Sequence, residues 1–398
     1  MSTAIWDECI SRYDGELRRR VVPFWVEHCE DREYGGYFTS LDRDGSVYDD
    51  TKYMWMQWRI VYLFATLYRT PYGEGREDWL QIARDGFDFL TKYGRLDDGS
   101  YYFELNRKGE PAMGPFSIFS DCFAAMGAAA LYHATGEERY RAEAESAMAS
   151  YIRRIPDPKG RYEKSLPGKE KFLSHGSYMI LANLGCVMAE CLGTSRYEAD
   201  CRTAIDTVMD RFYNPELKVV MENVRPDGTF DLESCEGRFV NPGHGLESMW
   251  FMMRYAEAHG DQALIRRAAG YADDLFRFGW DRKNGGIFYF MDALGKPHLE
   301  LQWDMKLWWP HNEATIAALY AYRLTGEERF LRMFEEVDAY AFSHFPDPEY
   351  GEWYGYLNRY GEPTHLLKGG KWKTFFHVPR SLLISIQQMK LLQQAERG

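Results

Sequence analysis

The chain has 398 residues, with 48 Lys and Arg against 60 Asp and Glu, which gives a formal net charge of −12. Hydrophobic residues make up 45% and charged residues 27% of the sequence, a globular balance that excludes a disordered or collagen-like chain. The acidic excess argues against nucleic acid or an anionic membrane as the main partner, because both bind basic surfaces.

The cysteines and the first residues of the chain favour a cytoplasmic protein. The seven cysteines form an odd set without a CxxC pair, so neither a disulfide framework nor a zinc site is expected. Residues 1–20 carry charges where a signal peptide needs an apolar stretch. No apolar run approaches the roughly 20 residues of a membrane span. We therefore expect a soluble protein with reduced cysteines and no membrane partner.

Similar segments recur along the chain at intervals of about 63 residues. TGEERY at 135–140 returns 190 residues later as TGEERF at 325–330, and NRKGEP at 106–111 returns 252 residues later as NRYGEP at 358–363. Glycine- and aromatic-rich segments with a turn begin near residues 35, 98, 160, 219, 285 and 352, and the segment at 160 is the poorest match. These intervals indicate about six units of roughly 60–66 residues.

In chain order, each unit starts with an aromatic strand pair and continues with an apolar helix, a TGEE-type break and a second, amphipathic helix. The helices are clearest at residues 138–152, 183–190 and 314–323, and the Thr or Gly of a break can cap a helix end. Two helices cannot bury their apolar faces alone, so six units predict an inner and an outer ring. The sequence thus predicts an all-α, single-domain (α/α)6 barrel over residues 1–398, with short β-hairpins at the active-site mouth. An open α-solenoid is the alternative.

Reactive side chains recur at the start of the helix that follows each hairpin. They are Arg59, Ser120 and Asp121, His175, His244 and Glu247, His311 and Glu313, and His377 and Arg380. In five of the six units they lie 21–25 positions after the hairpin; residue 244, for example, lies 23 positions after residue 221. Equal spacing in a closed ring predicts that these groups converge on one mouth of the barrel, in a pocket with several histidines.

The spacing within each group adds detail. His244 and Glu247 are three residues apart on one helical face, so we expect the carboxylate to orient the imidazole. His311 and Glu313 are two residues apart and would share a face only if the chain is not helical around Pro310. We interpret the adjacent Trp308 and Trp309 as pocket wall.

Other chemistries leave weaker signals. The histidines show neither HExxH nor HxH spacing, so no metal site is expected, and no nucleotide-binding loop is visible. Residues 368–373 form a basic, glycine-rich loop that we interpret as a mobile rim of the active site. A glycosidase needs two carboxylates, which Asp121, Glu247 and Glu313 can supply, so that alternative stays open.

The motifs resemble those of the N-acylglucosamine 2-epimerase family over nearly the whole chain. GSVYDDTKYMWMQWR, NPGHGLESMWF, MKLWWPHNEA and KGGKWKTFFHVPRSL are most similar to its N-acetylglucosamine 2-epimerase branch. The resemblance implies an (α/α)6 barrel and two essential histidines, His244 and His377. The site residues that it further implies are the arginines Arg59 and Arg380 and the glutamates Glu247 and Glu313.

The activity implied is interconversion of N-acetyl-D-glucosamine and N-acetyl-D-mannosamine. Once the sugar ring opens, one histidine removes the proton from C2 and the other returns a proton to the opposite face, while Arg59 or Arg380 stabilises the anionic intermediate. We expect Asp121, His175, Trp308, Trp309 and His311 to line the same sugar site. The alternatives are an epimerase or aldose–ketose isomerase for glucose, mannose or a cellobiose-type disaccharide, an (α/α)6 glycosidase, and a non-catalytic sugar-binding protein.

The resemblance also bears on cofactors and partners. The chemistry requires no metal or redox cofactor. Animal and cyanobacterial members of the family use ATP as an activator rather than a reactant, but the nucleotide loop of those members cannot be placed on this sequence. The resemblance further suggests that the protein is a homodimer. The molecule that it is expected to bind is a small sugar.

Overall fold

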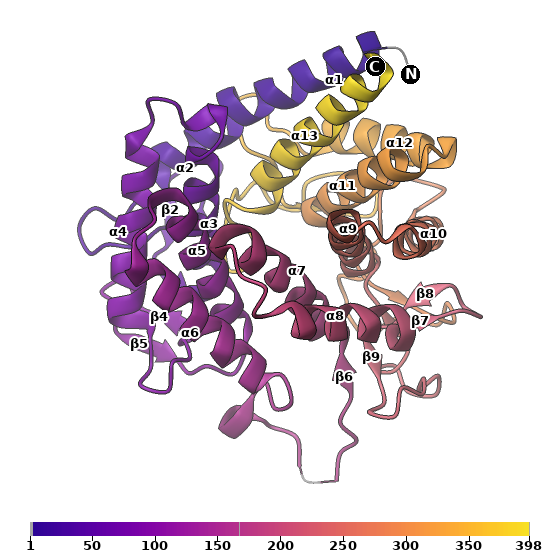
Figure 1. Cartoon of the computed structure of the whole chain (residues 1–398), viewed down its shortest axis with the longest axis horizontal. Coiled ribbons are helices and arrows are strands. Elements are labelled where there is room, and N and C mark those ends of the chain that lie inside the picture. The colour runs from indigo at the N-terminus through magenta and orange to yellow at the C-terminus, as the bar shows by residue number, and fades with distance from the viewer. Residues whose placement is uncertain (1–2, 167, 398) are drawn as a thin grey trace.

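Two concentric rings of helices make up the computed structural model, which describes residues 3–166 and 168–397 (Figure 1). The inner helices are α3 (Met54–Tyr68), α5 (Phe119–Thr135), α7 (His175–Leu192), α9 (Pro242–His259), α11 (Trp308–Thr325) and α13 (His377–Arg397). The outer helices are α1 (Thr3–Glu16) with its continuation α2 (Val22–His28), α4 (Glu77–Gly94), α6 (Glu138–Arg154), α8 (Glu198–Thr207), α10 (Gln262–Gly279) and α12 (Glu328–His344). Consecutive inner helices pack on each other, and each outer helix packs on an inner one. This arrangement is the predicted (α/α)6 barrel.

The burial of each helix follows its sequence pattern. In α5 every residue from Ser120 to Leu131 is buried, because this alanine-rich helix is apolar on all sides and touches helices all round. The outer helix α10 buries only one face, which includes Leu264, Ala268 and Leu275. Among the described helices, none is both long enough and apolar enough to span a bilayer.

Aromatic contacts close the inner ring. Phe375, just before α13, lies 4.8 Å from Phe64 of α3, and Phe376 lies 5.9 Å from Tyr62, measured between ring centroids. The open solenoid would keep the first and last inner helices apart, so it is wrong. The first and last helices, α1 and α13, also lie side by side (Figure 1).

Glycines end the inner helices at the predicted breaks. The residues after α5, α7, α9 and α11 adopt a left-handed conformation that suits glycine; they are Gly136 (φ 72°), Gly193 (φ 62°), Gly260 (φ 67°) and Gly326 (φ 71°). Such a residue turns the chain from an inner to an outer helix within a few positions. The interpretation of the TGEE-type breaks as helix ends is confirmed.

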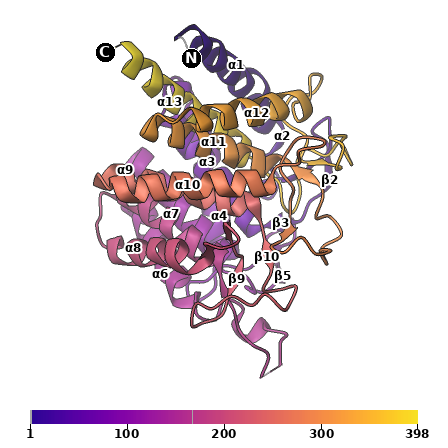
Figure 2. The ribbon, with the colours of Figure 1, turned by 90° about the vertical axis from the view of Figure 1, so that its right-hand side faces the viewer.

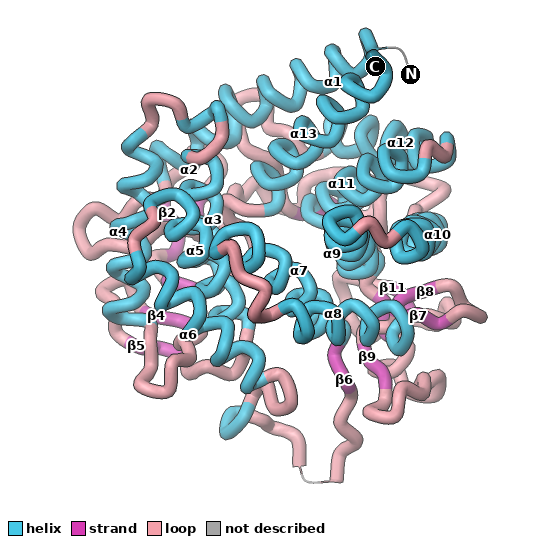
Figure 3. Tube along the Cα trace, in the orientation of Figure 1, coloured by secondary structure: helices cyan, strands magenta, loops and turns pink. Residues whose placement is uncertain are grey.

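The strands are two or three residues long and form small antiparallel sheets in the loops (Figure 3). They are β1 (Ser40–Leu41), β2 (Val47–Asp49), β3 (Lys52–Tyr53), β4 (Glu104–Leu105), β5 (Pro111–Met113), β6 (Leu173–Ser174), β7 (Tyr213–Asn214), β8 (Val219–Val220), β9 (Asn223–Val224), β10 (Phe239–Val240), β11 (Met291–Asp292), β12 (Lys306–Leu307) and β13 (Tyr356–Leu357). Strands β3, β6, β10 and β12 end just before α3, α7, α9 and α11, so the sheets lie at the N-terminal ends of these inner helices. Figure 2 shows β2, β3, β5 and β10 gathered on one side of the helices.

A repeated buried ion pair fastens three of these loops. In the first, Asp31 accepts the backbone N–H groups of Glu33 and Tyr34 with one carboxylate oxygen and the ammonium of Lys52 with the other, at 3.0 Å. The same arrangement recurs at Asp281 with Lys306 (3.1 Å) and at Asp347 with Lys368 (2.9 Å). Each carboxylate closes a tight turn and ties it to a lysine further along the chain. The loops around the mouth of the barrel are therefore held by buried charges.

Candidate active site

The reactive side chains lie in the first two turns of the inner helices. His244 and Glu247 are the third and sixth residues of α9, His377 and Arg380 are the first and fourth of α13, and Arg59 is the sixth of α3. The short strands before the helices bring these turns to the same end of the barrel. The structure brings all five side chains together there, as the equal spacing predicts.

Arg380 links three inner helices at the centre of this group. Its Nη2 atom lies 2.6 Å from Oε1 of Glu247 on α9 and 2.6 Å from Oε1 of Glu313 on α11. Glu313 also accepts the indole N–H of Trp250 at 2.8 Å. Burial lowers the pKa of Arg380, but the two carboxylates outweigh it and raise the pKa above its ordinary value. Arg380 is therefore a permanent cation that serves two acids.

His377 is oriented by Glu313. Its Nδ1 atom lies 2.7 Å from Oε1 of that carboxylate. An ionised carboxylate only accepts hydrogen bonds, so the proton of the neutral ring lies on Nδ1. Among the described residues Nε2 has no hydrogen-bond partner. Burial, Arg380 and Arg59 lower the pKa of His377 well below its usual value, so this imidazole is neutral at pH 7.

His244 is oriented by a different acid from the one that the spacing predicts. Its Nδ1 atom lies 3.1 Å from both oxygens of Glu222, in the loop between β8 and β9. The expected partner Glu247 instead binds Arg380. Burial lowers the pKa of His244, but the charge of Glu222 and the hydrogen bond to it raise the pKa above 6.5 on balance. A third of the His244 side chain is exposed, so solvent reaches this imidazole.

Trp309 connects the two histidines. The centroid of its ring lies 5.1 Å from that of His244 and 5.8 Å from that of His377. Gly243 makes this packing possible, because a Cβ atom there would lie 2.7 Å from the Trp309 ring. The two imidazoles therefore border the same aromatic side chain, on which the apolar face of a sugar can pack.

Arg59 is a buried cation without a counter-ion. Three aromatic rings surround its guanidinium at 4.1–4.6 Å, those of Trp55, Phe123 and Phe376. Among the described residues none forms an ion pair or hydrogen bond with it, and only 7% of the residue is exposed. Burial lowers the pKa of Arg59 to about 9, partly offset by the charge of Glu247. Such a cation can stabilise a negative charge that develops on a nearby atom.

Two predicted contacts do not join the group. Asp121 is fully buried and accepts hydrogen bonds from Arg154 (2.7 Å), Ser150 (2.9 Å) and the backbone of Tyr101 (2.9 Å), so it ties α5 to α6. His311 accepts the backbone N–H of Ile287 at 2.9 Å with Nε2, and its Nδ1 lies 2.6 Å from the carbonyl oxygen of Leu307. Partners within the protein occupy the polar atoms of both residues, so neither joins the group of reactive side chains, and a contact of either with a sugar stays a prediction.

The helical geometry explains why His311 lies apart from the group. Helix α11 begins at Trp308, so Pro310 lies inside its first turn and the chain is regular there. Residues two apart in a helix point to nearly opposite sides. Glu313 consequently faces His377, whereas His311 faces α12 and stacks on Tyr340, with ring centroids 5.1 Å apart.

His175 and Trp308 stand behind the group rather than within it. His175 is fully buried, with Nδ1 3.2 Å from Glu222 and Nε2 2.7 Å from the hydroxyl of Ser248. Trp308 is 1% exposed, and the centroid of its ring lies 6.2 Å from that of His377. Both side chains are buried against residues of the group, so a contact of either with a sugar stays a prediction.

The loop at residues 368–373 is not the mobile basic rim that its composition indicates. Lys368 is fully buried and pairs with Asp347, and Lys373 is 1% exposed and pairs with Glu352. Its exposed residue is Trp372, whose ring centroid lies 5.3 Å from that of Trp55. The charges of Lys368 and Lys373 are therefore internal, and Trp372 lies beside Trp55, one of the three rings around Arg59.

Two groups of side chains resemble metal ligands by composition. Among the described residues, His175, Glu222 and His244 form one such group, and Glu247, Glu313 and His377 form the other, with candidate ligand atoms within 4.8 Å of one another. In both groups the Nδ1 atoms already hydrogen-bond the carboxylates. We interpret them as acid–imidazole groups.

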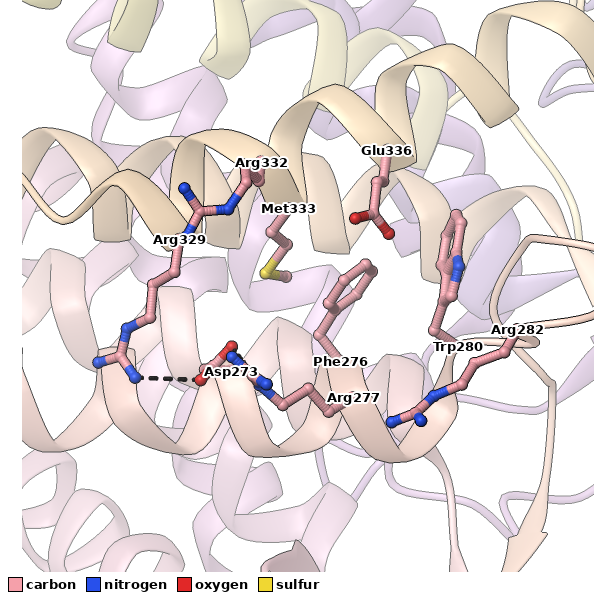
Figure 4. A pocket seen from close by; sticks show the side chains of 9 residues that line it. All are labelled: Asp273, Phe276, Arg277, Trp280, Arg282, Arg329, Arg332, Met333 and Glu336. Carbon is pink, nitrogen blue, oxygen red and sulfur yellow. Dashed lines mark hydrogen bonds and ion pairs between the residues drawn. The ribbon is translucent and has the colours of Figure 1, made fainter.

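A hollow of about 370 Å³ lies elsewhere, between α10 and α12 (Figure 4). Arg277 and Arg282 from one side and Arg329 and Arg332 from the other line it, and Arg329 pairs with Asp273 at 3.0 Å. None of the predicted site residues lines this hollow. This hollow is therefore separate from the group of reactive side chains at the mouth of the barrel.

The two rings of helices place the chain in the class of (α/α)6 barrels. The solved cellobiose 2-epimerase of Spirochaeta thermophila DSM 6192 has a TM-score of 0.83 to this chain at 18% identity and covers 98% of each chain. A solved D-mannose isomerase has the same TM-score at 17% identity, covering 95% of this chain and 97% of its own. At such identities the likeness shows the fold.

The sequence comparison identifies the family. The family model of N-acylglucosamine 2-epimerase (GlcNAc 2-epimerase) matches residues 36–381. The N-acylglucosamine 2-epimerase of Bos taurus is 42% identical over 398 residues, covering 97% of this chain and 92% of the bovine protein. The chain belongs to the N-acylglucosamine 2-epimerase family, as its motifs predict, and is an epimerase, that is, an isomerase.

Proposed function

We propose that this protein interconverts N-acetyl-D-glucosamine and N-acetyl-D-mannosamine by moving a proton at C2 of the open-chain sugar. One observation carries the proposal: His244 and His377 each hold a carboxylate on Nδ1, have no partner for Nε2 among the described residues, and have ring centroids within 5.8 Å of that of Trp309. An epimerase needs a base and an acid that act on opposite faces of one carbon. The identity to the bovine enzyme supports the N-acetylated substrate.

The pKa values of the two histidines are shifted in opposite directions. Burial and two arginines lower the pKa of His377, so this ring is neutral, whereas Glu222 raises the pKa of His244 against the effect of burial. We assign to the active pair one proton in excess of the neutral rings, held by His244. One imidazole takes the proton from C2 while the other donates a proton to the opposite face, and the reverse reaction exchanges these roles.

Removal of the C2 proton places negative charge on the oxygen at C1. Arg59 has no counter-ion of its own among the described residues, so its charge is available to this oxygen. Arg380 already neutralises Glu247 and Glu313 and serves to position them. We assign Arg59 to charge stabilisation, Trp309 to packing on the sugar, and Glu247 to a hydroxyl of the substrate.

Other sugars are the nearest alternatives. The same proton transfer would serve glucose and mannose, a cellobiose-type disaccharide, or an aldose–ketose isomerisation in which the proton returns to C1. A glycosidase is disfavoured, because it needs one carboxylic acid that keeps its proton. Here Glu247 and Glu313 both bind the same arginine.

Incubation with N-acetylglucosamine in heavy water, followed by NMR, tests the proposal. We expect N-acetylmannosamine with deuterium at C2. Glucose, mannose and cellobiose are offered in parallel, and faster conversion of any of them would reassign the substrate. Cleavage of a glycoside, or binding without exchange at C2, would overturn the proposed reaction.

Variants test the two histidines. We expect His377→Ala and His244→Asn to lower kcat by at least about 100-fold while the protein stays folded, because each removes an acid–base group. His259→Asn is the matched control, since His259 ends the same helix as His244 and lies on the surface. A wild-type rate in either site variant would exclude that histidine from the mechanism.

Cofactor, location and assembly are parts of the same proposal. We infer a cytoplasmic homodimer whose reaction needs neither a metal, a redox cofactor nor ATP, so that any effect of ATP would be allosteric. Assays with and without ATP and with a chelator test the cofactor requirement. Sedimentation of the purified protein tests the homodimer.

A further inference from the structure

Glu222 occupies a position that neither the repeat nor the family motifs single out. It lies in the loop between β8 and β9, is 7% exposed, and accepts from the Nδ1 atoms of two histidines, His244 at 3.1 Å and His175 at 3.2 Å. Burial raises the pKa of Glu222, but the two imidazoles lower it to about 2 on balance. Glu222 is therefore a carboxylate at any pH at which the protein is assayed.

The charge of Glu222 fixes the protons on its neighbours. An ionised carboxylate has no donor, so the ring nitrogen that faces it must carry hydrogen. For His244 this leaves Nε2 as the one atom that can accept or return a proton. The other tautomer would put an unprotonated Nδ1 against a negative charge and would leave the reactive position blocked by a proton.

The backbone and His175 hold Glu222 in place. The N–H of Glu222 donates to the carbonyl oxygen of Phe239 at 2.9 Å, and its carbonyl oxygen accepts the N–H of His175 at 2.9 Å. The ring of His175 is held in turn by the hydroxyl of Ser248, which lies 2.7 Å from Nε2. That hydroxyl also lies 2.7 Å from the carbonyl oxygen of His244, so His175 and Ser248 link Glu222 to the backbone of His244.

We propose that Glu222 is a positioning residue of the epimerase reaction, which keeps the proton of His244 on Nδ1 and presents Nε2 to the substrate, and that His175 fixes Glu222. This inference rests on the proposed function of His244. It makes the site nearly symmetrical, because Glu222 has the role towards His244 that Glu313 has towards His377.

The surroundings of His244 predict how Glu222 affects the pH dependence. The charged and titratable groups that face this imidazole are Glu222 from the loop, His175 from α7, Glu247 from its own helix, Arg59 from α3, and His377 and Arg380 from α13. Glu222 contacts the ring directly, whereas Glu247 is neutralised by Arg380. Loss of the Glu222 charge therefore lets burial and Arg59 lower the pKa of His244.

The consequence appears on the basic side of the pH profile. The active form of the pair carries one excess proton, and that proton leaves as the pH rises through the value set by His244. We expect Glu222→Gln to move the basic limb of kcat/KM to lower pH by about one unit. The amide oxygen can still accept from Nδ1, so kcat should fall only about 10-fold, whereas Glu222→Leu should lower kcat about 100-fold with KM within twofold.

Glu143→Gln is the matched control. Glu143 is also buried, at 8% exposure, and binds the hydroxyl of Tyr101 far from the histidines. Its replacement should alter stability and leave both limbs of the profile in place. A basic limb in Glu222→Gln that coincides with that of the control would overturn the proposal.

A measurement without substrate separates this inference from the proposed reaction. Long-range ¹H–¹⁵N spectra of protein labelled at histidine distinguish a protonated from an unprotonated ring nitrogen, and His244→Asn assigns the signal. Above the pKa of His244 we expect hydrogen on Nδ1 in the wild type and a mixture of tautomers in Glu222→Leu. Hydrogen on Nε2 in the wild type would refute the role of Glu222, even if the protein proves to act on another sugar.

Discussion

Replacing Arg380 with methionine tests the central ion network. The substitution keeps most of the aliphatic volume and removes the cation that lies 2.6 Å from both Glu247 and Glu313. These side chains are 6% and 0% exposed, so water cannot replace the lost partner. Two buried carboxylates would then remain in the same part of the barrel, uncompensated and repelling each other.

The expected loss of stability follows from these contacts. Charge centres about 4 Å apart interact by about 4 kcal/mol at an effective dielectric constant of about 20. Breaking one buried ion pair typically costs about 3–5 kcal/mol. Because one guanidinium serves two acids here, we expect Arg380→Met to lower the free energy of unfolding by about 5 kcal/mol. Adding Glu247→Gln should recover about 2 kcal/mol of that loss, since it removes one unpaired charge.

Urea unfolding at pH 7.5 measures the effect, provided that circular dichroism and tryptophan fluorescence give coincident transitions. Arg139→Met is the control, because Arg139 and Asp88 form an exposed pair at 2.7 Å between α4 and α6 that should be worth less than about 1 kcal/mol. A loss in Arg380→Met as small as that of the control would refute the idea that Arg380 neutralises both acids.

Three further outcomes are expected. Gly243→Ala should lower kcat and cost about 1–3 kcal/mol in urea unfolding, because the new methyl group would meet the ring of Trp309 at 2.7 Å. Gly270→Ala, with open space around it, is the control and should be neutral or stabilising. Equal effects of the two substitutions would contradict the packing of Gly243 against Trp309. His311→Leu should cost about 2–3 kcal/mol, since the N–H of Ile287 loses its acceptor, and should leave the pH profile of kcat/KM unchanged; a shifted profile would return His311 to the site. Asp281 has a pKa of about 2 against 3.8 in an unfolded chain, because burial, which raises the pKa, is outweighed by hydrogen bonds and by Lys306. Its contribution of about 2 kcal/mol to stability should therefore be present above pH 4 and disappear as the pH falls to 2. The thermal unfolding temperature of Asp281→Asn should differ from that of the wild type at pH 7 and approach it at pH 2.

The repeat predicted much of the architecture because it is a local signal. The spacing of TGEERY and TGEERF marks helix ends, and the structure has Gly136 and Gly326 in left-handed conformations there. Equal spacing from the hairpins placed Arg59, His244 and His377 at one end of the barrel. The repeat was sufficient to predict these features, because residues at the same position in each unit lie at the same level along the barrel axis.

The pairing of side chains was harder to predict, because it depends on contacts between units. Glu247 was expected to orient His244 since both lie on one helical face, yet Glu222 from the preceding loop takes that position. The signal available was a lone acid after the apolar run VVM, which indicates a buried carboxylate that needs a partner. Lys368 and Lys373 were misjudged for a similar reason, because their acidic partners lie in a neighbouring hairpin.

The meeting of the chain ends has a consequence for the topology. Trp6 of α1 donates its indole N–H to Glu396 of α13 at 3.1 Å, and α1 packs along α13. The order of the helices around the closed ring, rather than the position of the N-terminus, therefore determines this barrel. A circularly permuted chain, with a short peptide joining the present ends and new ends in the exposed turn around Ser195, should assemble the same rings.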